Sequence, residues 1–156
     1  MTNSDSIITN VRLANRSDYS QIIEFNKSMA LETENIILDN DQISDGVIAV
    51  LEDPNLGRYL IATIHEEIVG GLLLTLEWSD WHNKFYWWIQ SVYIKPESRR
   101  KGVYKTLYEY VCRSAKERGD VYAIRLYVDI NNQRARQVYQ NLGMNKSNYD
   151  MFEEVI

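Results

Sequence analysis

The sequence is poor in the residues that build metal centres and disulfide frameworks. Its 156 residues include one cysteine, Cys112, and two histidines, His65 and His82. One cysteine cannot form an internal disulfide or a cysteine-based zinc site, and two isolated histidines do not complete a metal site. We therefore expect no metal and no disulfide, which fits a reducing compartment such as the cytoplasm.

Long apolar runs and an excess of positive charge are also missing. No uninterrupted apolar segment approaches the roughly 20 residues that a membrane span needs. The N-terminal sequence MTNSDSIITN lacks the basic-then-apolar order of a signal peptide. With 17 basic and 22 acidic side chains the net charge is −5, the wrong sign for holding nucleic acid through its phosphates. We expect neither a membrane nor a nucleic-acid partner, and the acidic balance favours a small cationic one.

Linkers and repeats are absent, and the two prolines, Pro54 and Pro96, fall at apparent element boundaries. A chain of this length with 45% hydrophobic residues suits one globular domain. We therefore expect a single domain over residues 1–156.

Apolar periodicity predicts the elements of the first half of the chain. The expected order is a strand, two helices, and two antiparallel strands joined by a short polar turn. The ranges are 7–13 for the first strand, about 19–31 and 41–51 for the helices, 57–64 and 68–76 for the paired strands, and 78–84 for a following loop.

The apolar pattern of the second half of the chain predicts a strand, a helix and a parallel strand. A continuous apolar run indicates a central strand covered on both faces, and the following stripe of apolar residues spaced by four indicates a helix. The expected ranges are 85–94 for the central strand, 103–119 for the helix, 123–130 for the next strand, 135–142 for a short helix, and a last strand after residue 144.

This order predicts an α/β fold with a mixed, mostly antiparallel sheet and a central parallel βαβ unit flanked by helices. The C-terminal segment 148–156 mixes Tyr149, Met151, Phe152 and Val155 into a short apolar edge. A bare apolar edge invites pairing with another chain, so we expect the last strand to pair across a homodimer interface.

A basic, glycine-containing turn joins the central strand to the long helix. Its residues Arg99, Arg100, Lys101 and Gly102 directly precede the expected helix start at Val103. Free N–H groups in the first turn of a helix bind anions such as pyrophosphate, nearby cations reinforce them, and glycine lets the backbone approach closely. The alternative is an ordinary solvated helix start.

In its context this turn resembles the signature of the GNAT family of N-acetyltransferases, Gln/Arg-x-x-Gly-x-Gly/Ala after a strand and a proline-containing turn. Residues 99–103 match the first five positions, whereas Tyr104 replaces the small residue at the sixth. A second family signature, an Asn opening a helix followed by Ala and an aromatic-rich end before Gly, is similar to residues 131–144. The element order also agrees over almost the whole chain.

The resemblance implies a GNAT fold that binds acetyl-CoA, with the pantetheine along a splayed strand and the pyrophosphate in the turn. It implies that Tyr139 protonates the departing thiolate. The alternatives are a core aromatic for Tyr139 and a plain helix N-cap for Asn131. The implied cofactor-binding residues are Val92, Tyr93, Ile94, Arg99, Arg100, Lys101, Gly102, Val103, Tyr104, Lys105 and Asn131.

The acceptor amine must lose a proton, because a free alkylamine has a pKa near ~10.4. No nucleophilic triad is suggested, so direct transfer in a ternary complex is expected, with Glu77 as a catalytic carboxylate.

All four tryptophans lie between residues 78 and 88, a density that suits an aromatic wall around a cation. Solvated loop charges and core packing are the alternatives. The candidate acceptor-binding residues are Glu32, Glu34, Trp78 and Asp80.

We therefore expect an enzyme that transfers acetyl from acetyl-CoA to a primary amine of a small molecule. One alternative is a protein or peptide N-acetyltransferase, which needs an open peptide groove. The other is a non-catalytic sensor that binds acetyl-CoA, although Tyr139 argues against it because a sensor needs no phenol at that position.

Overall fold

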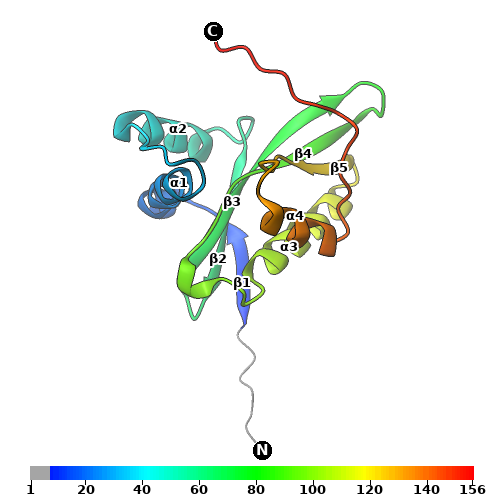
Figure 1. The fold of residues 1–156 in the computed structure, drawn as a ribbon. Helices are drawn as coiled ribbons and strands as arrows, with labels where there is room; N and C mark the ends of the chain where they lie inside the picture. Colours follow the sequence, from blue (N-terminus) through cyan, green and yellow to red (C-terminus); the bar gives the residue numbers. More distant parts are fainter. Residues whose placement is uncertain (1–7) are drawn as a thin grey trace, which may run out of the picture.

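The computed structural model describes residues 8–156, which form one sheet with helices on both of its faces (Figure 1). The strands are β1 (Thr9–Leu13), β2 (Arg58–Ile64), β3 (Glu67–Ser79), β4 (Lys84–Ile94) and β5 (Val121–Leu126); the helices are α1 (Tyr19–Glu34), α2 (Asn40–Glu52), α3 (Val103–Arg118) and α4 (Gln133–Asn141); and the 3-10 turns are η1 (Arg16–Asp18) and η2 (Pro96–Ser98).

The strands follow one another across the sheet in the order β1-β2-β3-β4-β5. Neighbours are antiparallel from β1 to β4, whereas β4 and β5 are parallel and α3 connects them. The mixed, mostly antiparallel sheet with its parallel βαβ unit is thereby confirmed. None of the helices in the described residues has the length and hydrophobicity of a membrane-spanning segment.

The core lies on both faces of the sheet because the central strands are apolar on both sides. On one face, Leu107 of α3 packs in a cluster with Leu72 and Trp87. On the other face, Val47 of α2 packs with Ile61 and α1 side chains. Successive residues of a strand point to opposite faces, so Trp87 belongs to the α3 side and its neighbours to the α1 side.

Two consecutive glycines let β3 pass close to its neighbours. A Cβ atom at Gly71 would lie 2.6 Å from the carbonyl oxygen of Leu60 and 3.3 Å from Ile61 Cδ1. Since the Leu60 oxygen is part of the β2 backbone, it cannot move aside without disturbing the sheet.

We therefore expect Gly71→Ala to lower the free energy of unfolding by about 2 kcal/mol, the usual cost of overpacking a core. Gly46 is the matched control, because no atom lies within 4 Å of its added Cβ and it sits inside α2. Gly46→Ala should raise stability by up to about 1 kcal/mol through helix propensity. Chemical denaturation of both variants checks the prediction, and an unchanged Gly71→Ala protein would contradict the tight contact.

The first helix is longer than its sequence predicts. It continues to Glu34 because Asn35 ends it in a left-handed conformation with φ 55°. The backbone N–H of Asn35 donates hydrogen bonds to the carbonyl oxygens of Ala30 and Leu31. Asparagine tolerates this conformation and replaces the usual C-terminal glycine. Consequently Glu32 lies on the last turn of a helix, not in a loop. Ile7, the first residue of the expected first strand, lies outside the described residues.

The later strands also differ from the prediction. The loop expected over 78–84 shrinks to a turn at 80–83, because β3 and β4 extend their pairing to Ser79 and Lys84. β5 ends at Leu126 instead of residue 130, since its pairing with β4 stops there. Residues 144–156 contain no helix or strand, so the expected last strand is absent from the single chain.

Candidate active site

β4 and the edge strand β5 pair over only part of their lengths and then separate. Their last paired residues are Ile89 and Leu126. Just beyond, Ser91 has φ 51° and the β3–β4 register shifts, which bends β4 away from its parallel neighbour. The backbone of Val92, Tyr93 and Ile94 therefore has no strand partner on the side of β5. Its N–H and C=O groups on that side are available to form hydrogen bonds with a bound molecule.

The turn before α3 is shaped to hold an anion. The sign of φ alternates, with positive values of 63° at Arg100 and 80° at Gly102. Residues that alternate in this way direct successive N–H groups into one concavity, a common anion site. α3 also starts without a side-chain cap, and its first backbone hydrogen bond runs from Thr106 N to Gly102 O, 3.0 Å. The N–H groups before Thr106 thus remain available to a ligand.

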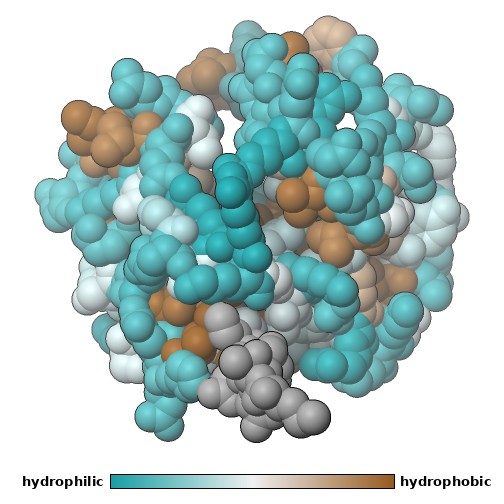
Figure 2. Space-filling view, turned by 60° about the horizontal axis from the view of Figure 1, so that its bottom comes forward, coloured by the Kyte–Doolittle hydropathy of each residue, from teal (hydrophilic) through white to brown (hydrophobic). Residues whose placement is uncertain are grey.

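Space and charge at this turn also suit a pyrophosphate. No atom lies within 4 Å of a Cβ built on Gly102, so the space in front of the first turn of α3 is open. Arg100 and Lys101 make no ion pair among the described residues, and Lys105 makes only an exposed contact of 3.7 Å with Glu109. The end of the molecule that carries the turn is mostly hydrophilic (Figure 2).

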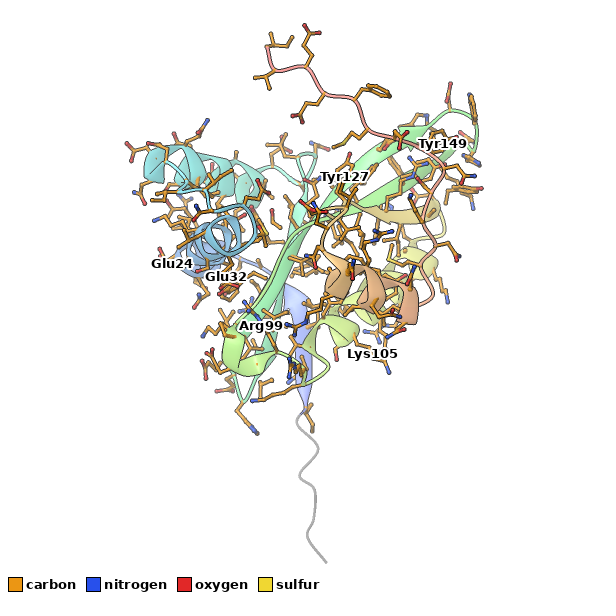
Figure 3. All side chains as sticks on the ribbon, in the orientation of Figure 1. Glu24, Glu32, Arg99, Lys105, Tyr127 and Tyr149 are labelled. Atoms are coloured by element: carbon orange, nitrogen blue, oxygen red, sulfur yellow. The ribbon has the colours of Figure 1, made fainter. Side chains whose placement is uncertain are left out.

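Arg99 has a different environment from the other basic residues of the turn. Its Nε donates to the Ile94 carbonyl, 2.9 Å, and its terminal nitrogen donates to Glu32 on α1, 2.6 Å. Tyr93 also donates its hydroxyl proton to Glu32, 2.8 Å. Burial raises the pKa of Glu32, but the hydrogen bonds from Arg99 and Tyr93 lower it on balance. Arg99 and Glu32, which face each other in Figure 3, therefore tie the turn to α1.

Tyr139 lies on α4 and packs against α3. Its ring meets the ring of Tyr104 edge-on, with centroids 5.7 Å apart. Burial raises the pKa of Tyr139, so its phenol stays protonated at neutral pH and is able to donate a proton. Tyr104, the residue that departs from the family signature, thus fills the space between the two helices instead of the turn.

The hydroxyl of Tyr104 is buried without a hydrogen-bond partner among the described residues. A buried hydroxyl that lacks a partner destabilises the folded state. We therefore expect Tyr104→Phe, which keeps the ring contact with Tyr139, to leave stability unchanged or raise it by up to about 1 kcal/mol. Thermal unfolding of the two proteins checks this expectation. A clear loss of stability would show that the hydroxyl has a partner in solution.

The start of α4 gives Asn131 no capping role. The N-cap is Asn132, whose side-chain oxygen accepts a hydrogen bond from Ala135 N, 3.0 Å. The backbone N–H of Asn131 donates to Asp129, 2.7 Å, and its own side chain is exposed without a hydrogen bond among the described residues. The interpretation of Asn131 as a helix cap is wrong, and its side chain is free to contact a ligand.

Glu77 belongs to an aromatic cluster on the sheet face opposite α3. Its carboxylate accepts hydrogen bonds from the Trp88 indole, 2.6 Å, and from Arg125, 3.4 Å. Tyr127 stacks on Trp88 with centroids 4.5 Å apart, and the Arg125 guanidinium lies 3.4 Å from the centre of the Tyr86 ring. Trp88 directly precedes Ile89, the last β4 residue paired with β5, so this cluster borders the opening between the strands.

The other predicted acceptor residues do not join this cluster. Trp78 packs edge-on against Phe85, 4.9 Å, on the opposite face of the sheet from Glu77. Asp80 lies in the exposed hairpin turn, where it accepts a hydrogen bond from Trp81 N, and Glu34 is exposed at the end of α1. The sequence predicts Trp78 at the acceptor site with Glu77. In the structure, the cluster around Glu77 contains Trp88, Arg125 and Tyr127 instead.

The match to known families decides the identity of this fold. The model of the acetyltransferase (GNAT) family matches residues 18–144. The chain belongs to the GNAT family of acetyltransferases. No curated protein sequence matches this GNAT chain.

Solved structures show the same GNAT fold. The "possible acetyltransferase" of Clostridium difficile 630 is 36% identical, covers 96% of this chain and 98% of its own, and has a TM-score of 0.90. A predicted acetyltransferase with acetyl-CoA from Clostridium acetobutylicum is 21% identical over 94% and 96% of the two chains, with a TM-score of 0.75. An aminoglycoside acetyltransferase from an uncultured soil metagenomic sample, in complex with sisomicin, is 16% identical over 95% and 96%, with a TM-score of 0.77.

Within residues 8–156, no group of three His, Cys, Asp or Glu side chains is placed to hold a metal ion. A cavity of about 560 Å³ lies between α3 and α4, but it reaches the turn only at Lys105. The donor-binding residues that the sequence predicts at 92–94 and 99–105 lie at the opening between β4 and β5 and at the turn.

Proposed function

We propose that this acetyltransferase is a single-domain enzyme that transfers acetyl from acetyl-CoA to a primary amine of a small cationic molecule. The observation that carries the proposal is the combination of an uncapped α3 N-terminus with the open backbone of β4 directly before it. The solved relative with acetyl-CoA supports the choice of donor. The single free thiol, Cys112, supports a cytoplasmic location.

Acetyl-CoA supplies an activated thioester when bound. The N–H groups of Val103, Tyr104 and Lys105 would hold its pyrophosphate, reinforced by the helix dipole and by Arg100 and Lys101. The open backbone of β4 would hold the pantetheine by strand-like hydrogen bonds. Tyr139, whose pKa burial raises, would donate its proton to the departing thiolate sulfur, and Asn131 would contact the donor from the start of α4.

The cluster around Glu77 would hold the acceptor. A protonated amine is attracted both to the carboxylate of Glu77 and to the π-faces of Trp88 and Tyr127. Arg125 and the Trp88 indole fix the carboxylate, so it presents an anion of defined position beside the opening between the strands. Glu77 would then take up the proton that the amine must lose before it attacks.

A thiol-release assay with acetyl-CoA tests the proposal on a panel of aminoglycosides, polyamines, amino acids and peptides. Turnover on small polycationic amines is the expected result, and the relative in complex with sisomicin makes aminoglycosides the first choice. Turnover restricted to peptides would favour a protein N-acetyltransferase. Donor binding with no turnover on any amine would favour the sensor.

The acceptor assignment predicts the effect of Glu77→Gln, which keeps the shape of the side chain and removes its charge. The KM for the amine should rise about tenfold, the loss of one charged hydrogen bond, while the KM for acetyl-CoA stays unchanged. Glu52→Gln is the control, because Glu52 pairs with Arg16 at the surface, 3.1 Å. Equal effects of the two substitutions in steady-state kinetics would remove Glu77 from the acceptor site.

A further inference from the structure

The last turn of α1 carries a carboxylate where a helix by itself disfavours one. Glu32 lies in this turn, close to the end of α1 at Glu34. The C-terminal end of a helix is the negative end of its dipole, so an anion there destabilises the helix. The last turn of α1 contains no basic residue to offset this charge. The charge of Glu32 is compensated from outside the helix instead.

Both compensating contacts come from the proposed donor site. One carboxylate oxygen of Glu32 accepts a hydrogen bond from the Tyr93 hydroxyl, 2.8 Å, and the other accepts one from Arg99, 2.6 Å. Tyr93 belongs to the open stretch of β4, and Arg99 is the first residue of the turn before α3. A single carboxylate thus joins α1 to both parts of the donor site.

Tyr93 and Arg99 are held by further contacts. The Arg99 Nε donates to the Ile94 carbonyl, 2.9 Å, and the guanidinium carbon lies 5.5 Å from the centre of the Tyr93 ring. The Tyr93 ring packs against Phe25 of α1 with centroids 5.2 Å apart and is only 8% exposed. The Arg99 side chain is therefore directed toward the end of β4 and α1, where it faces Glu32 (Figure 3).

We propose that Glu32 is a positioning residue of the donor site: through Arg99 and Tyr93 it fixes the end of β4 and the start of the turn against α1. This inference rests on the proposed function, because it takes the turn and the open backbone of β4 as the acetyl-CoA site. Glu32 acts without touching the donor. The Arg99 side chain serves as the link to α1, and Arg100 and Lys101 are the cations that attract the pyrophosphate.

The direction of the effect of Glu32→Gln separates this role from simple electrostatics. Removing a negative charge near a phosphate site should by itself strengthen the binding of the anion. If Glu32 positions the turn, losing its charged hydrogen bond from Arg99 should instead weaken acetyl-CoA binding, by about tenfold. Glu34→Gln is the matched control. It removes the same charge from the same end of α1, and the Glu34 side chain is exposed and makes no hydrogen bond among the described residues.

Arg99→Lys separates linking from direct phosphate binding. Lysine keeps the positive charge but lacks the planar fork that holds the Ile94 carbonyl and Glu32 at once. Arg99→Lys should therefore weaken acetyl-CoA binding about as much as Glu32→Gln does. The double variant should bind no more weakly than either single variant, because both substitutions break the same link.

Isothermal titration of these variants and the wild type with acetyl-CoA measures the affinities, and thermal unfolding shows that each protein is folded. In steady-state kinetics Glu32→Gln should raise the KM for acetyl-CoA and leave the KM for the amine unchanged. The positioning role alone is overturned if the wild type binds acetyl-CoA and Glu32→Gln binds it equally or more tightly, if only the KM for the amine rises, or if the losses in the double variant add. A wild type that does not bind acetyl-CoA overturns both this role and the proposed function.

Discussion

Replacing Tyr139 by phenylalanine should lower kcat by about a hundredfold or more, the usual contribution of a general acid. The substitution keeps the ring that meets Tyr104 and removes only the hydroxyl, so the binding of acetyl-CoA should be nearly unchanged. The reason is that, in the proposed mechanism, the thiolate leaves with a proton that the half-buried phenol supplies. Steady-state rates and calorimetric affinities measured on the same preparations give both quantities.

The pH dependence provides a second readout for Tyr139. Because burial raises its pKa, the phenol stays protonated until the pH exceeds the ordinary tyrosine value of about 10. The wild-type rate should therefore fall only above that value, and this fall should vanish in Tyr139→Phe. Tyr110→Phe, the same change on α3 instead of α4, should leave rate and profile unchanged. Equal rates for wild type and Tyr139→Phe would remove Tyr139 from the mechanism.

Filling the space before α3 should abolish most of the affinity for acetyl-CoA. Gly102→Trp places an indole where the structure is open and strains a residue whose φ is 80°. Losing the hydrogen bonds from two or more N–H groups to a charged phosphate weakens binding by about a hundredfold or more, at 1.5–3 kcal/mol each. Isothermal titration with acetyl-CoA measures the change.

Gly119→Trp is the control for backbone strain, because Gly119 has φ 81° and equally open surroundings at the other end of α3. It should destabilise the protein similarly yet keep the donor affinity. Arg100→Glu with Lys101→Glu should also weaken donor binding, and more strongly at low salt. If Gly102→Trp and Gly119→Trp bind acetyl-CoA equally well, the turn is not the phosphate site.

The sequence was most informative where local chemistry alone determines the structure. The turn at residues 99–102 could be predicted, because a glycine and three basic residues before an apolar helical stripe indicate an open helix start. The splay of β4 could not be derived from its residues. It depends on the left-handed conformation of Ser91 and on a register shift between β4 and β3. Neither feature can be recognised in the apolar pattern of the strand.

The surroundings of Glu77 also could not be predicted from the sequence. The density of tryptophans between residues 78 and 88 suggested Trp78 for the acceptor site together with Glu77. However, Glu77 and Trp78 are neighbours in a strand and therefore point to opposite faces. The partner of Glu77 is Trp88, brought across the sheet by β3–β4 pairing, together with Arg125 from β5. Contacts between residues far apart in the chain depend on register, which cannot be derived from one sequence.

In the proposed function, the chain binds acetyl-CoA through the turn before α3 and the open backbone of β4. Isothermal titration of one preparation with acetyl-CoA and with S-acetylpantetheine, which lacks the pyrophosphate, tests it directly. We expect saturable binding of acetyl-CoA at one site per chain and markedly weaker binding of S-acetylpantetheine. No binding of acetyl-CoA, or equal affinity for the two compounds, would contradict it.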